Sequence, residues 1–343
     1  PPTAIDSPTI DDQRRKARTT MYAATVTRTD GPAALEVTDT DPPAPGDGQV
    51  LIDVKAAGVN FPDLLLTKNM YQVKPEPPFT LGGELAGIVR EAPADSGFSP
   101  GDRVAASTTT GAFAEQALAS ASSVFPLPDA MSFAAGACLP MNYLTMTFAL
   151  LKRGQLQQGE TVLVHGAAGG IGTATIQLAS AMGARVISVV STEDKARFVS
   201  SVGSHEVVLA DGFKDSVAEL TGGRGADLVV DPVGGDRFTD SLRSLASLGR
   251  LLVIGFTAGD IPTVKVNRLL LNNIDVRGVA WGAYALADPA RLRAEWNVLL
   301  PYLESGVVDP PIAATYPLSR AGEAVARLDD RTVLGKVVVD PAA

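Results

Sequence analysis

The feature that most constrains the fold is a glycine-rich turn that directly follows a run of apolar residues. The apolar run spans residues 161–165, and Gly166, Gly169 and Gly172 then recur at every third position. This spacing lets the chain turn tightly after a strand, approach a phosphate closely and pack the next helix against the strand. The first turn of such a helix offers free N–H groups to an anion. The segment therefore predicts a strand–turn–helix unit that binds a dinucleotide.

Strand and helix patterns alternate from this turn to residue 273. The predicted strands are 161–165, 185–190, 206–209, 227–231 and 250–254, with helical patterns between them. Alternation of this kind predicts βαβ units, and so an α/β fold with a doubly wound parallel sheet. Residues 274–279 predict one more strand at the edge of that sheet. A helical pattern also covers residues 143–151.

The flanking segments follow a different pattern. Residues 21–125 hold short apolar runs separated by proline and glycine, which predicts a β-rich domain. A helix over 289–304 and a last strand over 336–340 are expected after the parallel sheet. The predicted organisation is a flexible N-terminal tail (1–20), a β-rich domain (21–140 and 286–343) and an inserted nucleotide-binding domain (141–285).

Composition excludes several classes of partner. The net charge of −9 argues against binding to nucleic acid or to an anionic membrane surface. No apolar run approaches the roughly 18 residues of a membrane span, and no secretory leader is recognisable, so we expect a cytoplasmic protein. The single cysteine, Cys138, has an apolar setting and is expected to pack in a core. One cysteine and two histidines (His165 and His205) do not supply an ordinary zinc site.

Seven motifs together carry a resemblance to a known family. They are AGVNFPD (57–63), GGELAG (82–87), GDRV (101–104), HGAAGGIG (165–172), DPVGG (231–235), GRLLVIG (249–255) and LGKVVV (334–339). In this order and spacing the chain resembles the medium-chain dehydrogenase/reductase superfamily. Within it, the chain is similar to the zinc-independent quinone oxidoreductases, which include zeta-crystallin. The resemblance covers nearly all of residues 21–340 and implies a Rossmann domain inserted in a GroES-like catalytic domain.

Two departures from the zinc-dependent members of that superfamily bear on the chemistry. Asn60 stands where those proteins carry a zinc-binding cysteine, and Gly83 stands where they carry a histidine ligand. Without a Lewis acid, oxidation of an alcohol is poorly supported. The resemblance therefore implies reduction of an electron-poor acceptor, such as a quinone or an α,β-unsaturated carbonyl compound.

The same resemblance carries the substrate pocket to Asn60, Asp63 and Tyr71. Asn60 could donate a hydrogen bond to a carbonyl oxygen, and Tyr71 could stack on a ring or donate a proton. Structural alternatives stay open for each: Asn60 could cap a turn, Asp63 could cap the next helix and Tyr71 could only line the wall. Glu84 is interpreted as an internal hydrogen-bond or ion-pair partner.

Cofactor contacts follow from the nucleotide-binding unit and from the resemblance. The residues expected to border the dinucleotide are Thr145, Ala168, Gly169, Gly170, Ile171, Ser191, Lys195, Val233, Gly234, Gly255, Phe256 and Thr257.

The end of the second strand bears on which dinucleotide is bound. Ser191 stands where NAD enzymes usually carry an acidic residue, and Lys195 matches a family lysine that neutralises the 2′-phosphate, which favours NADPH over NADH. Glu193 and Asp194 leave open that this segment is only the first turn of a helix, with Lys195 a surface charge. Relatives often carry a tyrosine at the position of Ala210.

The sequence thus favours an NADPH-dependent, zinc-independent reductase of quinones or enones, an NADPH:quinone oxidoreductase. Two alternatives stay open: a medium-chain reductase of enoyl thioesters, and a nucleotide-binding protein with little catalysis. Family members often pair the edge strand across a two-fold axis, so a homodimer is expected. Trp281 and Tyr284 could pack at that interface or reach the cleft between the domains.

Overall fold

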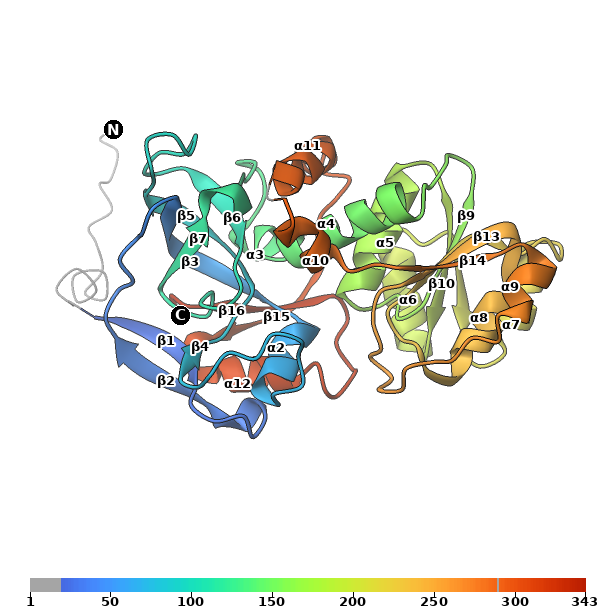
Figure 1. Cartoon of the computed structure of the whole chain (residues 1–343), viewed down its shortest axis with the longest axis horizontal. Helices are drawn as coiled ribbons and strands as arrows, with labels where there is room; N and C mark the ends of the chain where they lie inside the picture. The colour runs from blue at the N-terminus through green and yellow to red at the C-terminus, as the bar shows by residue number, and fades with distance from the viewer. Residues whose placement is uncertain (1–19, 289) are drawn as a thin grey trace, which may run out of the picture.

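The computed structural model describes residues 20–288 and 290–343. The tail predicted over 1–20 therefore lies outside the described residues, apart from residue 20. Figure 1 shows two domains side by side, with the helices α4, α10 and α11 in the region where they meet.

The first domain is β-rich and combines segments from both ends of the chain. Two of its sheets have the strand orders β2-β1-β4 and β15-β16-β3-β5-β6-β8, and β7 pairs with β3. Its strands are β1 (Met21–Val26), β2 (Leu35–Thr40), β3 (Gln49–Val59), β4 (Phe79–Thr80), β5 (Glu84–Glu91), β6 (Arg103–Ser107), β7 (Gln116–Ser120), β8 (Val124–Pro126), β15 (Ile312–Pro317) and β16 (Lys336–Asp340). Its helices are α2 (Phe61–Thr67), α3 (Phe133–Gly136) and α12 (Ala321–Ala326).

The second domain holds a six-stranded parallel sheet of order β11-β10-β9-β12-β13-β14. Its strands are β9 (Thr161–Val164), β10 (Arg185–Val190), β11 (Glu206–Leu209), β12 (Ala226–Asp231), β13 (Leu245–Val253) and β14 (Asp275–Gly278). Its helices are α5 (Gly170–Ala181), α6 (Glu193–Val202), α7 (Phe213–Leu220), α8 (Phe238–Arg243) and α9 (Asn267–Asn272). In chain order the strands run 3-2-1-4-5-6, which is the Rossmann arrangement. The predicted fold class is therefore confirmed.

The central position of β9 follows from its composition. Leu163 pairs with Ile187 of β10 on one side and with Val229 of β12 on the other, and all three side chains are fully buried. Burial of each such side chain contributes about 1.5–3 kcal/mol relative to exposure. This strand is thus held on both edges, and the turn that follows it starts from a fixed point.

Three helices occupy the region between the domains: α4 (Leu139–Thr147), α10 (Trp281–Leu286) and α11 (Ala290–Glu304). The helix predicted over 143–151 starts earlier, at Leu139, and changes to π-helical geometry over Phe148–Arg153. The sequence did not predict β2, β4, β8, β15 or α10, because each is short and lacks a sustained apolar period.

Candidate active site

The glycine-rich turn joins the buried end of β9 to the first turn of α5. Gly166 has a positive φ of 58°, which favours glycine, and Gly169 is the N-cap of α5. A Cβ atom on Gly172 would lie 2.4 Å from the backbone of Ala167, so the turn closes tightly on itself. The first N–H groups of α5 have no acceptor within the helix and are free for an anion.

Two further loops meet this turn at the carboxyl edge of the sheet. The Asp231 carboxylate accepts hydrogen bonds from the N–H groups of Val233 (2.8 Å) and Gly234 (2.9 Å), which fixes the loop after β12. The Thr257 N–H donates to the Pro232 carbonyl oxygen (3.1 Å), which ties the loop after β13 to it.

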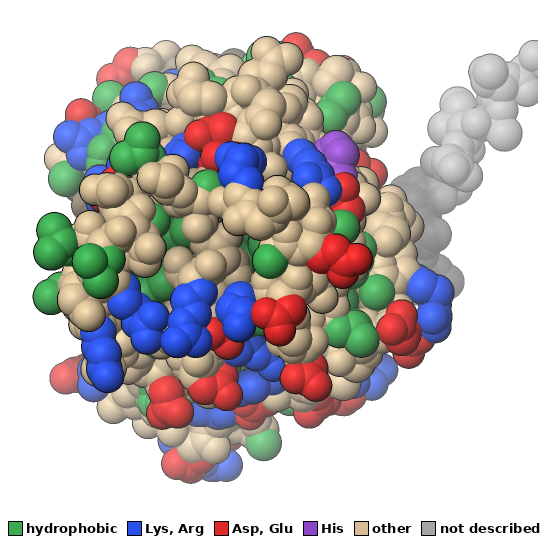
Figure 2. Space-filling model, turned by 90° about the vertical axis from the view of Figure 1, so that its right-hand side faces the viewer, with side chains coloured by type: hydrophobic (Ala, Val, Ile, Leu, Met, Phe, Trp, Pro, Cys, Tyr) green, Lys and Arg blue, Asp and Glu red, His purple; other side chains and the backbone are tan. Residues whose placement is uncertain are grey.

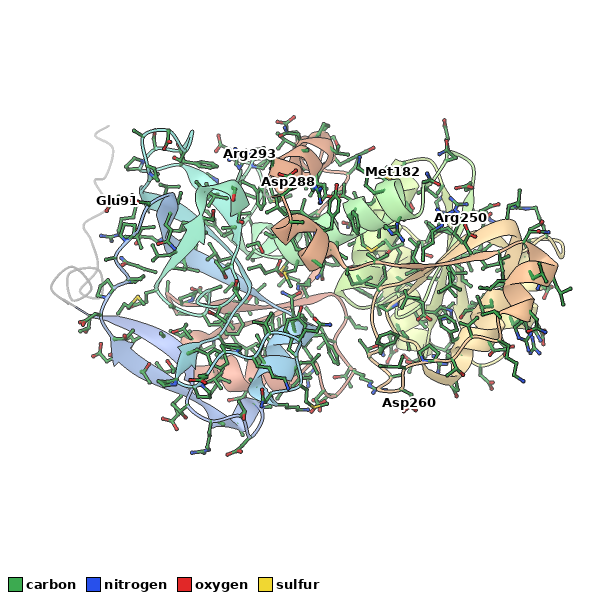
Figure 3. The ribbon with its side chains drawn as sticks, in the orientation of Figure 1. Glu91, Met182, Arg250, Asp260, Asp288 and Arg293 are labelled. Carbon is green, nitrogen blue, oxygen red and sulfur yellow. The ribbon has the colours of Figure 1, made fainter. Side chains whose placement is uncertain are left out.

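Close approaches hold the same two loops and the glycine turn together. A Cβ atom on Gly166 would lie 3.2 Å from Val233, and one on Gly234 would lie 3.0 Å from Phe256. Asp260, labelled in Figure 3, belongs to the loop after β13, and its carbonyl oxygen accepts from the Gly235 N–H (3.2 Å). The structure therefore brings the predicted cofactor residues of three separate loops to one edge.

A pair of basic side chains lies at the end of β10. The Lys195 ammonium donates to Ser191 Oγ (3.2 Å) and to the carbonyl oxygen of Arg331 (2.7 Å). The Arg331 guanidinium, which comes from the β-rich domain, donates to the Thr257 carbonyl oxygen (3.0 Å). Partial burial and the nearby positive charge of Arg331 lower the pKa of Lys195. Across residues 20–288 and 290–343 the acceptors of both cations are neutral, one hydroxyl and two carbonyl oxygens, so both charges are available to an anionic ligand.

A buried polar network lies where the β-rich domain meets the glycine turn. Asn60 Nδ2 donates to Glu84 Oε1 (2.7 Å), and Asn60 Oδ1 accepts from Lys336 Nζ (2.6 Å) and from Asn142 Nδ2 (3.0 Å). Glu84 and Lys336 form an ion pair at 3.0 Å with almost no solvent exposure. The interpretation of Glu84 as an internal partner agrees with this geometry. Asn60 commits its strong hydrogen bonds to the network, and its second N–H faces the Gly58 carbonyl oxygen at 3.4 Å.

Asp63 and Tyr71 lie beside this network. The Asp63 carboxylate accepts from the Asn60 N–H (2.8 Å) at the start of α2, as expected of a residue that caps the helix. Burial raises the pKa of Asp63 to about 7, although Lys336 lowers it. Burial and the neighbouring Asp63 also raise the pKa of Tyr71, whose ring is half-buried against the β-domain core. The Tyr71 phenol is therefore neutral at pH 7, and it lies within the electrostatic reach of the Asp63 carboxyl group.

Thr145 lies on α4, one turn after Asn142, so the two residues share a helix face. Among residues 20–288 and 290–343, no side-chain hydrogen bond joins Thr145 to the other predicted cofactor residues, although α4 packs against α5. Ala210 lines a pocket of about 330 Å³ at the carboxyl end of β11, together with Phe213, Asp236 and Arg237.

Cys138 packs in a core, as expected, and His165 is also buried. The Cys138 thiol is fully buried, and burial raises its pKa to about 12, so the thiolate does not form near neutral pH. His165 is buried against Phe213 and bonds Ser241 Oγ at 2.8 Å. Burial lowers the pKa of His165 to about 4.

Trp281 and Tyr284 of α10 pack inside the protein. Tyr284 stacks on Phe148 with ring centroids 4.4 Å apart. The buried Trp281 indole N–H donates to Glu295 Oε2 at 2.8 Å, while Glu295 Oε1 finds no partner in the described part of the chain. Burial raises the pKa of Glu295 to about 7.

This buried carboxyl group predicts a pH-dependent stability. The fold favours the protonated form of Glu295, so the free energy of unfolding falls as pH rises from about 4.5 to about 7. Glu295→Gln keeps an acceptor for Trp281 but cannot ionise. In thermal unfolding, the variant is expected to match the wild type near pH 4.5 and to be more stable by about 2 kcal/mol at pH 8. Equal stability of both proteins at pH 8 would show that Glu295 stays uncharged or is solvated.

Among residues 20–288 and 290–343, no three His, Cys, Asp or Glu side chains are grouped so that they could hold a metal ion. None of the helices in those ranges is long and apolar enough to cross a membrane.

The fold and the site together define a class of protein. A glycine turn on a Rossmann sheet, with free N–H groups, two unpaired cations and a β-rich domain against it, fits a nicotinamide dinucleotide. This is the architecture of a medium-chain dehydrogenase/reductase. Residues 46–129 match the family described as alcohol dehydrogenase GroES-like domain, and residues 170–303 match the family described as zinc-binding dehydrogenase.

Comparison with related proteins identifies the family within this class. Rat quinone oxidoreductase-like protein 2 is 37% identical over 309 residues, which cover 89% of this chain and 88% of that protein. A probable oxidoreductase from Mycobacterium abscessus has a solved structure with 46% identity and a TM-score of 0.87, covering 94% of this chain and 99% of that one. The Escherichia coli quinone oxidoreductase structure complexed with NADPH shows 28% identity and a TM-score of 0.85, covering 93% and 100%. The chain belongs to the quinone oxidoreductase family of the medium-chain dehydrogenases/reductases, and it is an oxidoreductase.

Three site residues were not found from the sequence: Asn142, Arg331 and Lys336. Arg331 lies in a turn between a helical and a strand segment, and no motif around it indicates a binding residue. Lys336 is the lysine of the 334–339 motif. The motif was recognised in the sequence, but the buried position of its lysine side chain was not predicted. Asn142 lies on a helix whose residues are mostly buried, where one amide carries little signal.

Proposed function

We propose that this protein is an NADPH-dependent reductase that transfers a hydride, without zinc, to quinones or related α,β-unsaturated carbonyl compounds. The observation that carries the proposal is the pair of unpaired cations, Lys195 and Arg331, beside Ser191 at the end of β10. Two positive charges without a carboxylate suit a 2′-phosphate, whereas the ribose hydroxyls of NADH call for an acidic residue there. The NADPH complex of the Escherichia coli relative supports the same cofactor.

Different residues would bind the two halves of the cofactor. The first turn of α5, with Ala168, Gly169, Gly170 and Ile171, would hold the pyrophosphate through backbone N–H groups. The nicotinamide half would be bordered by Val233, Gly234, Gly255, Phe256, Thr257 and Thr145. When bound, the nicotinamide supplies the hydride.

The chain's own side chains would orient the acceptor and complete the proton balance. A carbonyl compound that accepts a hydride at carbon also needs one proton. Tyr71 is the donor that we propose, because it is a neutral, half-buried phenol whose pKa responds to the charge of Asp63. Asn60, with its strong hydrogen bonds used inside the network, would shape the pocket wall rather than polarise the acceptor.

Substitution of Tyr71 tests this function. The purified protein should oxidise NADPH when given a panel of quinones and enones, and Tyr71→Phe should lower kcat with an enone roughly 100-fold while the dissociation constant for NADPH stays the same. Tyr302→Phe in α11 is the matched control and should leave both values unchanged. Turnover of enoyl thioesters alone would favour the enoyl-thioester reductase, and tight NADPH binding without any turnover would favour a nucleotide-binding protein. An unchanged kcat in Tyr71→Phe would remove the phenol from the reaction.

We also propose that the protein forms a homodimer through the edge of the Rossmann sheet. β14 is the outermost strand of its sheet among the described residues, and Leu270 and Leu271 of the preceding α9 are 77% and 73% exposed. Figure 2 shows hydrophobic side chains gathered at one edge of the Rossmann end of the molecule. A second copy would cover both the strand edge and this apolar surface. Sedimentation equilibrium at micromolar concentration tests the assembly, and a monomer would contradict it.

A further inference from the structure

The ammonium group of Lys336 is held by three acceptors in the interior. Nζ donates to the carbonyl oxygen of Val59 (3.0 Å), to Asn60 Oδ1 (2.6 Å) and to Glu84 Oε1 (3.0 Å). The side chains of Lys336 and Glu84 are 4% and 0% exposed. An ammonium has three N–H donors, so none is left for solvent or for a ligand. β16 places this side chain beside Asn60, because Val337 pairs with Val59 of β3.

The same charge pair is tied to the helix between the domains. Glu84 Oε2 accepts from the backbone N–H of Met141 (2.7 Å), which belongs to the first turn of α4. Asn142, the next residue, donates to Asn60 Oδ1. Lys336 thus fixes the amide of Asn60 from one side and Asn142 fixes it from the other.

The network also touches the glycine turn. A Cβ atom on Gly170 would lie 1.8 Å from Asn142 Oδ1 and 3.0 Å from Lys336 Cδ. The N–H of Gly335, the residue before Lys336, donates to the Ala168 carbonyl oxygen (2.8 Å). Residues 335 and 336 therefore contact both ends of the segment 168–170, where free N–H groups begin.

We propose that Lys336 is a positioning residue for the dinucleotide: through Asn60, Asn142 and Gly170 its ammonium holds the first turn of α5 in its binding geometry. The proposal rests on the proposed function, since it requires a dinucleotide at this turn. It assigns Lys336 no contact with the reacting atoms. Its effect on binding is separate from its effect on stability, and the two can be measured separately.

The effects of Lys336 on stability and on NADPH binding can be separated because of how buried ion pairs contribute to stability. Loss of one partner leaves an uncompensated buried charge and strongly destabilises a fold, whereas replacement of both partners by neutral groups is often close to neutral. If the pair only supports the fold, a doubly neutral variant should recover stability and cofactor binding together. If Lys336 positions the turn, stability should return without tight binding.

The experiment compares Lys336→Met with Lys336→Met/Glu84→Gln in the full chain. The matched control is Arg250→Met/Glu160→Gln, a mostly buried pair at the amino end of the Rossmann sheet, where Figure 3 labels Arg250. The readouts are the Tm of the unliganded protein and the dissociation constant for NADPH from fluorescence titration.

We expect Lys336→Met to lower Tm by roughly 10 °C and the double variant to return within roughly 3 °C of the wild type. Both should bind NADPH roughly tenfold more weakly, while the control pair keeps wild-type binding whatever its Tm. Wild-type affinity in the double variant would overturn the inference alone. A wild-type protein that binds no NADPH would overturn the proposed function, and this inference with it.

A second variant covers the case in which the charge variants do not fold. Asn142→Leu keeps the Lys336–Glu84 pair and removes only the amide between Asn60 and Gly170. We expect near wild-type Tm with NADPH binding weakened roughly tenfold. Unchanged binding in this variant would also overturn the inference.

Discussion

The double variant Lys195→Ala/Arg331→Ala is expected to bind NADPH roughly 100-fold more weakly than the wild type while its affinity for NADH changes less than about threefold. Each cation would form a charge-assisted hydrogen bond to the 2′-phosphate, worth about 1.5–3 kcal/mol, and about 1.4 kcal/mol corresponds to a factor of ten. NADH has no such phosphate, so its affinity should change little. Titration of both nucleotides into both proteins gives the four dissociation constants.

The control for this prediction lies on the same helix. Arg197 of α6 is exposed and already pairs with Asp194, so Arg197→Ala removes the same charge two residues from Lys195 without touching the proposed site. It should change NADPH affinity less than about twofold, because screened surface charges contribute little. An unchanged ratio of NADPH to NADH affinity in the double variant would contradict the cofactor assignment.

The second large effect is expected from Gly170→Ala. Alanine stabilises a helix relative to glycine by up to about 1 kcal/mol, so helix propensity alone predicts a small gain. The added Cβ would instead lie 1.8 Å from Asn142 Oδ1 and 3.0 Å from Lys336 Cδ, so either the Asn142 amide leaves its bond to Asn60 or the turn is displaced. We expect a Tm lower by roughly 5 °C and NADPH binding weakened by roughly 100-fold, because displacement of the turn removes several backbone contacts at once.

Gly282→Ala is the matched substitution. Gly282 also lies in the first turn of a helix, α10, with nothing within 4 Å of an added Cβ. Its Tm should stay the same or rise slightly, and NADPH binding should not change. If Gly170→Ala behaved like Gly282→Ala, the close approach between the glycine turn and Asn142 would not exist in solution.

The fold was predictable where local patterns dominate. Residues 162–164 of β9 and 228–230 of β12 are uniformly apolar, because both faces of the centre of a parallel sheet are buried. Strands also recur with helices between them. The glycine turn was predictable for the same reason: its spacing is dictated by backbone geometry within eight residues. The short strands β2 and β15 were missed, since each is only six residues long, has no fully buried side chain and lacks a sustained apolar period.

The site was predictable only in part. Ser191 and Lys195 lie within one turn of each other, and the sequence places them together. Arg331 reaches them from 136 residues away, and Lys336 reaches Glu84 across 252 residues. The first contact depends on how the two domains dock, and the second on how distant strands join one sheet, and no local pattern encodes either. The domain boundaries at 140/141 and 285/286 and the roles of the individual site residues stay predictions for the same reason.

Transfer of deuterium from NADPH labelled at C4 of the nicotinamide is the sharpest test of the proposed hydride transfer. With an enone as acceptor and one face of C4 deuterated at a time, the product should carry one deuterium at carbon from one face only, as measured by mass spectrometry. Labelled product from neither face, with NADPH bound and not oxidised, would contradict the account.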